Sequence, residues 1–495
     1  MESNKNSHSR TTIHSLPLEI LINILSLTIL DQHCLIEDLR DSPALKGICG
    51  PDTLSRVCSL WRHVIHQFPS LWSHIDIALN HPLNPRLVAR AHFLSERAGS
   101  TPLEIHIFDL TFMVRLKNGR FASGVGRHGR SSPSTPKIDP STICNFELSQ
   151  SAPMRIQSLD FNYTLQRGLH TYHMSALQYF LSKCTPNILT HFSMTGWVPT
   201  HASFIEPADH PQTFNSVLLD IPSQLFESVW LGTTHLMLNG LCPHWGSKAY
   251  HGLVELRIGR SVPVMTEAQF ANILRYSPGL RVLHITSVVE DLLPLDDPVV
   301  PVHLEDLEDL KLRNFQGKDL GTSDEMLRWI APGLKPLQVN FDQYAPKEAI
   351  SFCARSNIAR LFFTISTEEI VAPMVHRCSW LEILALSAGL YPARDLCSIL
   401  HPIDGRHPTG LVSTTKVDTL YLANFMVLPL SDLEDAVAEY SVRRLIIRNS
   451  RIEYKAEEGL KEAGDPSEIR TLLSTLKCSI VEYLEERCWL DQAGW

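Results

Sequence analysis

Histidine and cysteine are the residue types in this chain best suited to metal binding and acid–base chemistry. The chain has 495 residues, of which 23 are histidine and 11 are cysteine. Their spacing does not match HExxH, a pair of CxxC motifs or a GxSxG turn. The nearest cluster, Cys242-Pro243-His244, offers two ligands where a structural zinc ion needs four. We therefore expect no metal site, no cofactor and no catalytic residue. An enzyme whose site is assembled from distant residues is an alternative that spacing does not test.

A second chemical candidate is the stretch from Gly124 to Gly129, which has the GxGxxG spacing of a dinucleotide-binding loop. That loop must open a helix, because the pyrophosphate lies on the helix N-terminus. Here the next residues are Ser-Ser-Pro-Ser-Thr-Pro, which do not open a helix of useful length. Residues 115–142 as a whole are rich in Gly, Ser, Pro and Arg, so we expect a disordered loop rather than a nucleotide site.

The elements that would position any site follow from a six-residue phrase with apolar residues at positions 1, 4 and 6. It occurs twelve times between Ile156 and Ile447, for example as LRVLHI from Leu280 and LEILAL from Leu381. Most copies are 20–29 residues apart, the spacing of leucine-rich repeats. Helical patterns fill the intervals, including capping boxes that begin at Thr266 and Ser431. Each repeat can bury its apolar faces only against its neighbours, which predicts an α/β fold: a curved solenoid with a parallel inner sheet and outer helices.

Shorter patterns flank the repeats. Ile75 and Ile77 alternate as in a strand, a helix is expected from Arg86 to Ala98, and residues 102–108 alternate again. After the last repeat, Asp465 and Pro466 open a helical pattern that we expect to run to about residue 488 and to cap the solenoid.

Two amphipathic helices are predicted near the N-terminus. Pro17 suits the first turn of the first helix, in which Ile20, Leu21, Ile24 and Leu25 form one apolar stripe. The second helix begins with Thr53 as its cap and shares one face among Leu54, Val57, Cys58, Trp61 and Ile65. Two short helices cannot bury this many apolar groups between themselves, so something else must cover them.

These residues carry a resemblance to a known family. LPLEIL from Leu16, LSRVCSLWR from Leu54 and PSLW from Pro69 resemble an F-box, in the F-box-like form common in mushroom-forming fungi. The resemblance implies a small helical module that binds the Skp-type adaptor of SCF (cullin–RING) ubiquitin ligases, and hence a non-catalytic substrate-recognition subunit. The alternative is a leucine-rich-repeat scaffold whose first helices are only a cap. By resemblance, the adaptor-binding residues are Leu16, Pro17, Ile20, Leu21, Ile24, Val57 and Trp61.

The patterns and the resemblance together suggest a division of the chain. We expect a tail at 1–12, an F-box-like module at 13–72 and a leucine-rich-repeat-like solenoid at 73–490. The module contains an insertion at about 31–53, which departs from compact F-boxes, and the solenoid contains the loop at 115–142 and the capping helix at about 466–488.

The residues that flank the fourth position of each phrase should point away from the core, because side chains of a strand alternate between its faces. From the fifth copy onward this set is rich in Arg and Lys. It predicts a surface for an unknown target that is acidic or phosphorylated. The alternative is that these arginines pair with neighbouring acids and only solubilise the sheet. The residues chosen for target binding are Arg257, His284, Lys311, Arg313, Arg360, Phe362, Tyr421, Arg444 and Arg448.

The charge and hydropathy of the chain argue against nucleic acid and membranes as partners. A net charge of −9 and a pI near 6.2 argue against general nucleic-acid binding. The longest apolar run, residues 20–30, is much shorter than a membrane span, and the polar start lacks the apolar region of a signal peptide. Cysteines that are scattered and odd in number are typical of a reducing compartment. We therefore expect a cytoplasmic or nuclear protein that does not bind membranes.

Overall fold

The computed structural model describes most of the chain. The predicted tail at 1–12, the loop at 115–142 and most of the insertion at 31–53 lie outside the described residues, as does the GxGxxG stretch. The described residues are 13, 16–30, 50–79, 84–109, 145–148, 153–164, 171–197, 203–210, 216–287, 289–294, 297–313, 325–342, 347–365, 371–388, 396–400, 415–456, 459–463 and 465–484.

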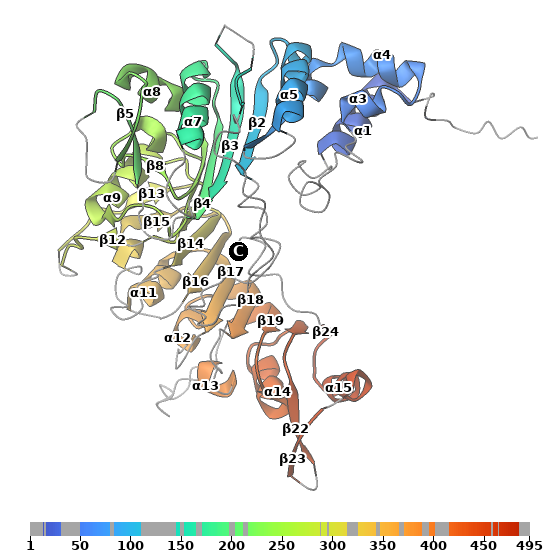
Figure 1. The fold of residues 1–495 in the computed structure, drawn as a ribbon. Coiled ribbons are helices and arrows are strands. Elements are labelled where there is room, and N and C mark those ends of the chain that lie inside the picture. Colours follow the sequence, from blue (N-terminus) through green and yellow to red (C-terminus); the bar gives the residue numbers. More distant parts are fainter. Residues whose placement is uncertain are drawn as a thin grey trace, which may run out of the picture. The chain divides into compact units, whose positions relative to one another are not determined.

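A parallel sheet of 14 strands dominates the α/β fold (Figure 1). The order of the strands in the sheet follows their order in the chain, so each strand is joined to the next by a crossover connection. The strands are β1 (His74–Leu79), β2 (Leu103–Asp109), β3 (Ile156–Thr164), β4 (His191–Trp197), β7 (His235–Asn239), β9 (Glu255–Ile258), β11 (Val282–Ile285), β14 (Asp309–Arg313), β16 (Leu337–Asp342), β17 (Ile358–Ile365), β18 (Trp380–Ala388), β19 (Lys416–Ala423), β21 (Arg444–Arg448) and β24 (Ile480–Leu484).

Eleven of the twelve copies of the repeat phrase fall on strands of this sheet, and the register aligns the central residues of most of them. Leu283 lies opposite Leu256 on one side and Leu310 on the other. The third copy, by contrast, forms β6 (Ser216–Leu219) in a separate small sheet with β5 (Phe204–Pro207) and β8 (Cys242–Pro243). The eighth copy is displaced by two residues, because Val339 rather than Leu337 lies opposite Leu310.

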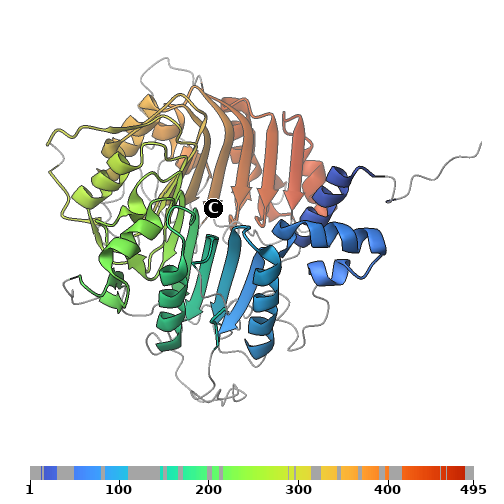
Figure 2. The same ribbon diagram turned by 90° about the horizontal axis from the view of Figure 1, so that it is seen from above.

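The helices that were expected between the strands lie along one side of the strands within each part of the chain (Figure 2). The predicted helix near 86–98 is present as α5, whose apolar residues are buried, and the Thr266 capping box is present in full. The helices are α5 (Asn84–Ala98), α7 (Thr171–Lys183), α8 (Ser223–Trp230), α9 (Glu267–Tyr276), α11 (Lys347–Arg355), α12 (Ala372–Val375), α13 (Leu396–Leu400), α14 (Leu430–Glu439) and α15 (Pro466–Leu473).

Short elements complete the connections. Three are single 3-10 turns, and the others are short strands that pair outside the main sheet. These elements are η2 (Pro69–Trp72), η3 (Lys248–Tyr250), η4 (Met326–Trp329), β10 (Met265–Thr266), β12 (Val289–Glu290), β13 (Val302–Leu304), β15 (Ile330–Pro332), β20 (Leu428–Pro429), β22 (Ile452–Ala456) and β23 (Gly459–Glu462).

Three local predictions were wrong. The helix expected across Leu54–Ile65 is two helices, α3 (Pro51–Leu54) and α4 (Ser59–Gln67). Extended backbone at Cys58 separates them, and its Sγ accepts a hydrogen bond from the Trp61 amide at 3.4 Å, so Cys58 rather than Thr53 caps α4. The capping box at Ser431 is absent, because α14 already begins at Leu430.

The third error concerns the C-terminal capping helix. Asp465 and Pro466 open α15 as predicted, but the helix ends at Leu473 and the chain returns to the sheet as β24. Val481 lies opposite Leu445, so β24 carries a further copy of the repeat register at the edge of the sheet. Backbone hydrogen bonds to β21 favour the strand there over a longer helix.

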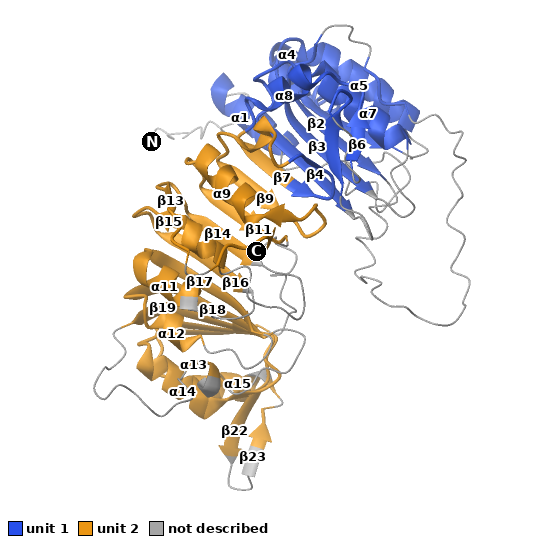
Figure 3. Cartoon of the chain, turned by 90° about the vertical axis from the view of Figure 1, so that its left-hand side faces the viewer, with its two compact units in different colours: residues 1–233, 238–244 blue, residues 234–237, 245–495 orange. Residues whose placement is uncertain are grey.

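The chain divides into two compact units (Figure 3). The first unit contains residues 1–233 and 238–244, and the second contains residues 234–237 and 245–495. The boundary that the sequence suggests near residue 72 lies inside the first unit, between η2 and β1. Within the described ranges, no helix combines the length and the apolar character that crossing a bilayer requires.

Candidate functional site

The first helix, α1 (Leu18–Leu30), is apolar on two sides. Leu21 and Leu25 are buried, with exposed fractions of 1% and 0%. Ile20 is 45% exposed, Ile24 36% and Leu27 66%, and their spacing places them on another face of the helix. The single stripe predicted from the sequence is therefore divided into a buried part and an exposed part.

The other predicted adaptor-binding residues lie around α1 and α4, which belong to the first unit. Leu16 is half-buried and Pro17 is exposed, directly before α1. Val57 is 61% exposed in the turn between α3 and α4. Trp61 is half-buried, and its indole N–H is buried without an acceptor among the described residues.

Trp72, and not Trp61, is the tryptophan that anchors this part of the chain. It is buried, and its indole N–H donates to the Ile65 carbonyl at 2.9 Å. Its ring stacks on His66 at 5.8 Å and meets Phe93 of α5 edge-on at 5.6 Å. These contacts join α4 to α5, so Trp61 can be substituted without removing the central packing residue.

The second candidate surface is the face of the main sheet in the second unit. The alternation predicted from the phrase is confirmed, because Leu256 is buried between half-buried Glu255 and Arg257. The register also brings many of the predicted target-binding residues together. One row crosses nine strands, and each of its residues is the register partner of the next: Arg257, His284, Lys311, Asn340, Phe362, Ala385, Tyr421, Ile446 and Glu482.

The remaining predicted residues lie in two parallel rows. Successive register partners on four neighbouring strands are Arg360, Ile383, Thr419 and Arg444. Both arginines therefore belong to one row, which lies two residues before the first row along each strand. Arg313 and Arg448 belong to a row near the carboxyl ends of the strands. The side chain of Arg313 lies outside the described part of the structure.

Several of these basic residues have carboxylate partners within the protein. Arg257 Nε lies 2.6 Å from Glu255 Oε1, and Arg444 lies 2.6 Å from Glu482 Oε1. Arg360 makes two hydrogen bonds to Glu382, at 2.9 and 3.1 Å, which lower the pKa of that carboxyl and raise the pKa of the guanidinium.

His284 behaves similarly, with Nε2 2.8 Å from Asp309 Oδ2. The alternative in which the arginines pair with neighbouring acids therefore describes Arg257, Arg360 and Arg444. An acidic ligand would have to displace these carboxylates. Such exposed pairs contribute only about 0–1 kcal/mol each, so displacement is feasible.

Two of the pairing acids were missed in the sequence. Glu382 occupies the second position of its phrase, which alternation assigns to the core, yet it is exposed enough to reach Arg360. Glu482 belongs to β24, which was expected to be a helix.

The sequence also failed to reveal a group formed by His74, Asp76 and His106 on β1 and β2. Both strands were predicted, but the register that places Asp76 beside His106 is not encoded in the spacing of either strand. The Cys242-Pro243-His244 cluster, whose spacing comes nearest to a metal-binding motif, lies on β8 and just after it.

No known protein-family model matches the chain, and no curated protein matches it. The F-box resemblance therefore rests on the residues described above.

Proposed function

We propose that this protein is the substrate-recognition subunit of an SCF-type ubiquitin ligase. Its N-terminal helices would bind a Skp-type adaptor, and the sheet face of the second unit would bind the target. Ubiquitin transfer would belong to other subunits, so this chain would not be an enzyme.

The observation that supports adaptor binding is the exposed apolar face of α1. Ile20, Ile24 and Leu27 are exposed on a helix in which Leu21 and Leu25 are buried. Val57 adds a further exposed apolar side chain in the turn before α4. Contiguous exposed apolar groups mark protein-interaction surfaces, because leaving them in water is costly. The F-box resemblance suggests that the partner of this surface is a Skp-type adaptor.

The experiment that tests adaptor binding is co-purification of the full chain with a Skp-type adaptor. The variant carries Ile20→Asp and Trp61→Ala. Burial of each side chain in an interface is worth roughly 1.5–3 kcal/mol, so the double variant should weaken binding about a hundredfold or more. The matched control is Leu334→Asp, which alters a 91% exposed leucine in the second unit.

Circular dichroism of each variant separates loss of binding from loss of folding, since Trp72 remains in place to pack α4 against α5. An adaptor complex that the double variant retains, or that the wild-type chain does not form, would leave the repeat scaffold without a ubiquitin link as the better account.

The observation that supports target binding is the row that runs from Arg257 to Glu482. It places the aromatic side chains of Phe362 and Tyr421 in one line with basic and polar groups on a single sheet face. Aromatic anchors beside charged groups are typical of protein-recognition surfaces. The paired arginines make the surface mixed rather than purely basic, so the target we propose is an acidic or phosphorylated segment whose oxyanions replace the internal carboxylates.

A further inference from the structure

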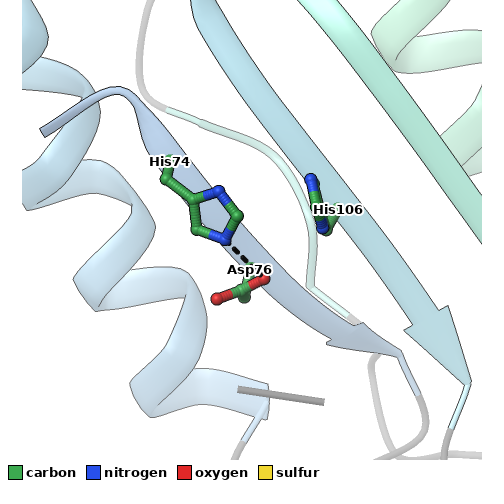
Figure 4. A group of neighbouring side chains, drawn as sticks. All are labelled: His74, Asp76 and His106. Carbon is green, nitrogen blue, oxygen red and sulfur yellow. Dashed lines mark ion pairs between the residues drawn. The ribbon is translucent and has the colours of Figure 1, made fainter. Parts of the chain in front are cut away.

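Three side chains with metal-binding atoms converge on the first two strands of the main sheet. His74 and Asp76 lie on β1 and His106 lies on β2, where it is the register partner of Asp76. One nitrogen or oxygen from each residue lies within 4.8 Å of the other two. Figure 4 shows the three side chains gathered over the two strands. All belong to the first unit.

The alternation of β1 accounts for this convergence. Ile75 and Ile77 are fully buried, and α5 packs against β1. His74 and Asp76 therefore point to the opposite face of the sheet. Neighbouring strands lie about 4.8 Å apart, so a residue on β2 that faces the same way is within reach of both.

Asp76 is buried without a full set of partners. The residue is 8% exposed, and its Oδ1 makes no hydrogen bond with any described residue. That atom lies 3.4 Å from Nε2 of His74 and makes no aligned hydrogen bond with it. A buried carboxylate oxygen without a hydrogen-bond donor is costly, and a cation is one way to satisfy it.

A second carboxylate orients His74. Oε2 of Glu104 lies 3.6 Å from Nδ1 of His74, the ring nitrogen opposite the one that faces Asp76. In carboxylate–histidine–zinc arrangements a carboxylate on one ring nitrogen orients the histidine, and the opposite nitrogen binds the metal.

We propose that His74, Asp76 and His106 bind a divalent transition-metal ion, for which zinc is the best match. Two imidazoles and one carboxylate suit zinc, whereas magnesium and calcium prefer ligand sets made of oxygen alone. Around a tetrahedral zinc ion the ligand atoms are about 3.3–3.5 Å apart, so binding requires the three side chains to close by about 1 Å.

Three protein ligands leave a fourth position for an exchangeable ligand, which is water or an oxygen, nitrogen or sulfur donor of a bound molecule. His74 is accessible enough for this, because 28% of its side chain is exposed. The proposal does not depend on the ubiquitin-ligase function, since it uses the geometry of β1 and β2 alone.

The test uses the full chain, purified without a polyhistidine tag and stripped with a chelator. Zinc is titrated by calorimetry, and cobalt is used as a spectroscopic probe of coordination. The wild-type chain should bind one zinc ion at this site, and cobalt should give the visible spectrum of a site with nitrogen and oxygen ligands.

Asp76→Asn and His106→Gln keep the size of each side chain and should lower zinc affinity at least about a hundredfold. Glu104→Gln should lower it about 10–100-fold, because it removes only the orienting carboxylate. His191→Ala is the matched control, since His191 lies two strands from Glu104 in the same row and is not one of the three ligands. It should bind zinc like the wild type.

Circular dichroism verifies that each variant is folded before titration. A folded wild-type chain that binds no zinc would overturn the proposal. So would wild-type zinc affinity and an unchanged cobalt spectrum in both Asp76→Asn and His106→Gln, since the bound ion would then lie elsewhere. If Asp76→Asn does not fold, His106→Gln alone decides between these outcomes.

Discussion

At the scale of single residues, Glu267 shows how a buried charge is held. It is the first residue of α9 and is completely buried. Its Oε1 accepts hydrogen bonds from Arg328 at 2.6 Å and from the Trp329 indole at 2.5 Å, and its Oε2 accepts one from the Leu293 amide. The N-terminus of α9 adds a favourable dipole. These contacts compensate the cost of removing the carboxylate from water.

We expect Glu267→Ala to lower the free energy of unfolding by about 3–5 kcal/mol, because it leaves the guanidinium of Arg328 buried without its carboxylate. Urea unfolding followed by circular dichroism measures this change. Glu434→Ala, which alters an exposed glutamate on α14, is the control and should stay within about 0.5 kcal/mol of the wild type. Equal destabilisation by the two substitutions would contradict the role given to the buried pair.

The sequence could indicate the apolar residues of this chain but not which of them are structural. Trp61 and Trp72 both lie in apolar patterns, and only the packing against Phe93 of α5 shows that Trp72 is the anchor. Likewise Ile20 and Leu21 belong to one predicted stripe but differ from 45% to 1% in exposure. Such differences depend on where the neighbouring elements lie, which short-range periodicity does not encode.

At the scale of elements, the strands were more predictable than the helices at either end. Alternation identified β1, β2 and most of the later strands because one face of each must be buried. Ile469, Leu473 and Leu476 do fit a helical period, and α15 contains the first two of them. Ile480 and Tyr483 fit the same period, yet they lie on β24. This segment is short, and pairing with β21 supplies partners for backbone groups that an edge strand would otherwise leave unpaired, so a strand forms instead of a longer helix.

We expect truncation after Ser479, which removes β24, to lower the melting temperature by about 4–8 °C. The deletion exposes the edge of β21 and removes the hydrogen bond that the Tyr483 hydroxyl donates to the Ser450 carbonyl. It should also increase aggregation, since an open edge strand pairs with other chains. Scanning calorimetry and light scattering measure the two effects.

Truncation after Leu484 is the control, because it retains β24 and shortens the chain only beyond it. If both truncations melt at the same temperature, the edge strand does not contribute to stability as we infer.

At the scale of the whole molecule, the parallel register determines which side chains meet. The repeat phrase was sufficient to predict an α/β fold with parallel strands. It was not sufficient to predict the group around His74, because a change of register by two residues would leave every apolar position on the same face and move Asp76 away from His106. The displaced eighth copy, where Val339 replaces Leu337 opposite Leu310, shows that such shifts occur in this chain.

The same register makes the proposed target surface testable through its internal ion pairs. If the sheet face binds acidic segments, Glu382 competes with the target for Arg360. Glu382→Gln removes that competition and should strengthen binding of a fluorescent, phosphoserine-rich acidic peptide about twofold to fivefold. Arg360→Glu should weaken it about tenfold or more. Both effects should be larger at low ionic strength, because salt screens exposed charges.

Fluorescence anisotropy at low and physiological ionic strength measures these affinities. The control is Glu462→Gln, which releases Arg451 from an exposed pair outside the main sheet, at 3.4 Å in the wild type. If Glu382→Gln and Glu462→Gln strengthen peptide binding equally, the peptide responds to the net charge of the protein and not to the sheet face. If neither Glu382→Gln nor Arg360→Glu alters binding, the arginines of this row serve only to pair with their neighbouring acids, and the target must bind elsewhere.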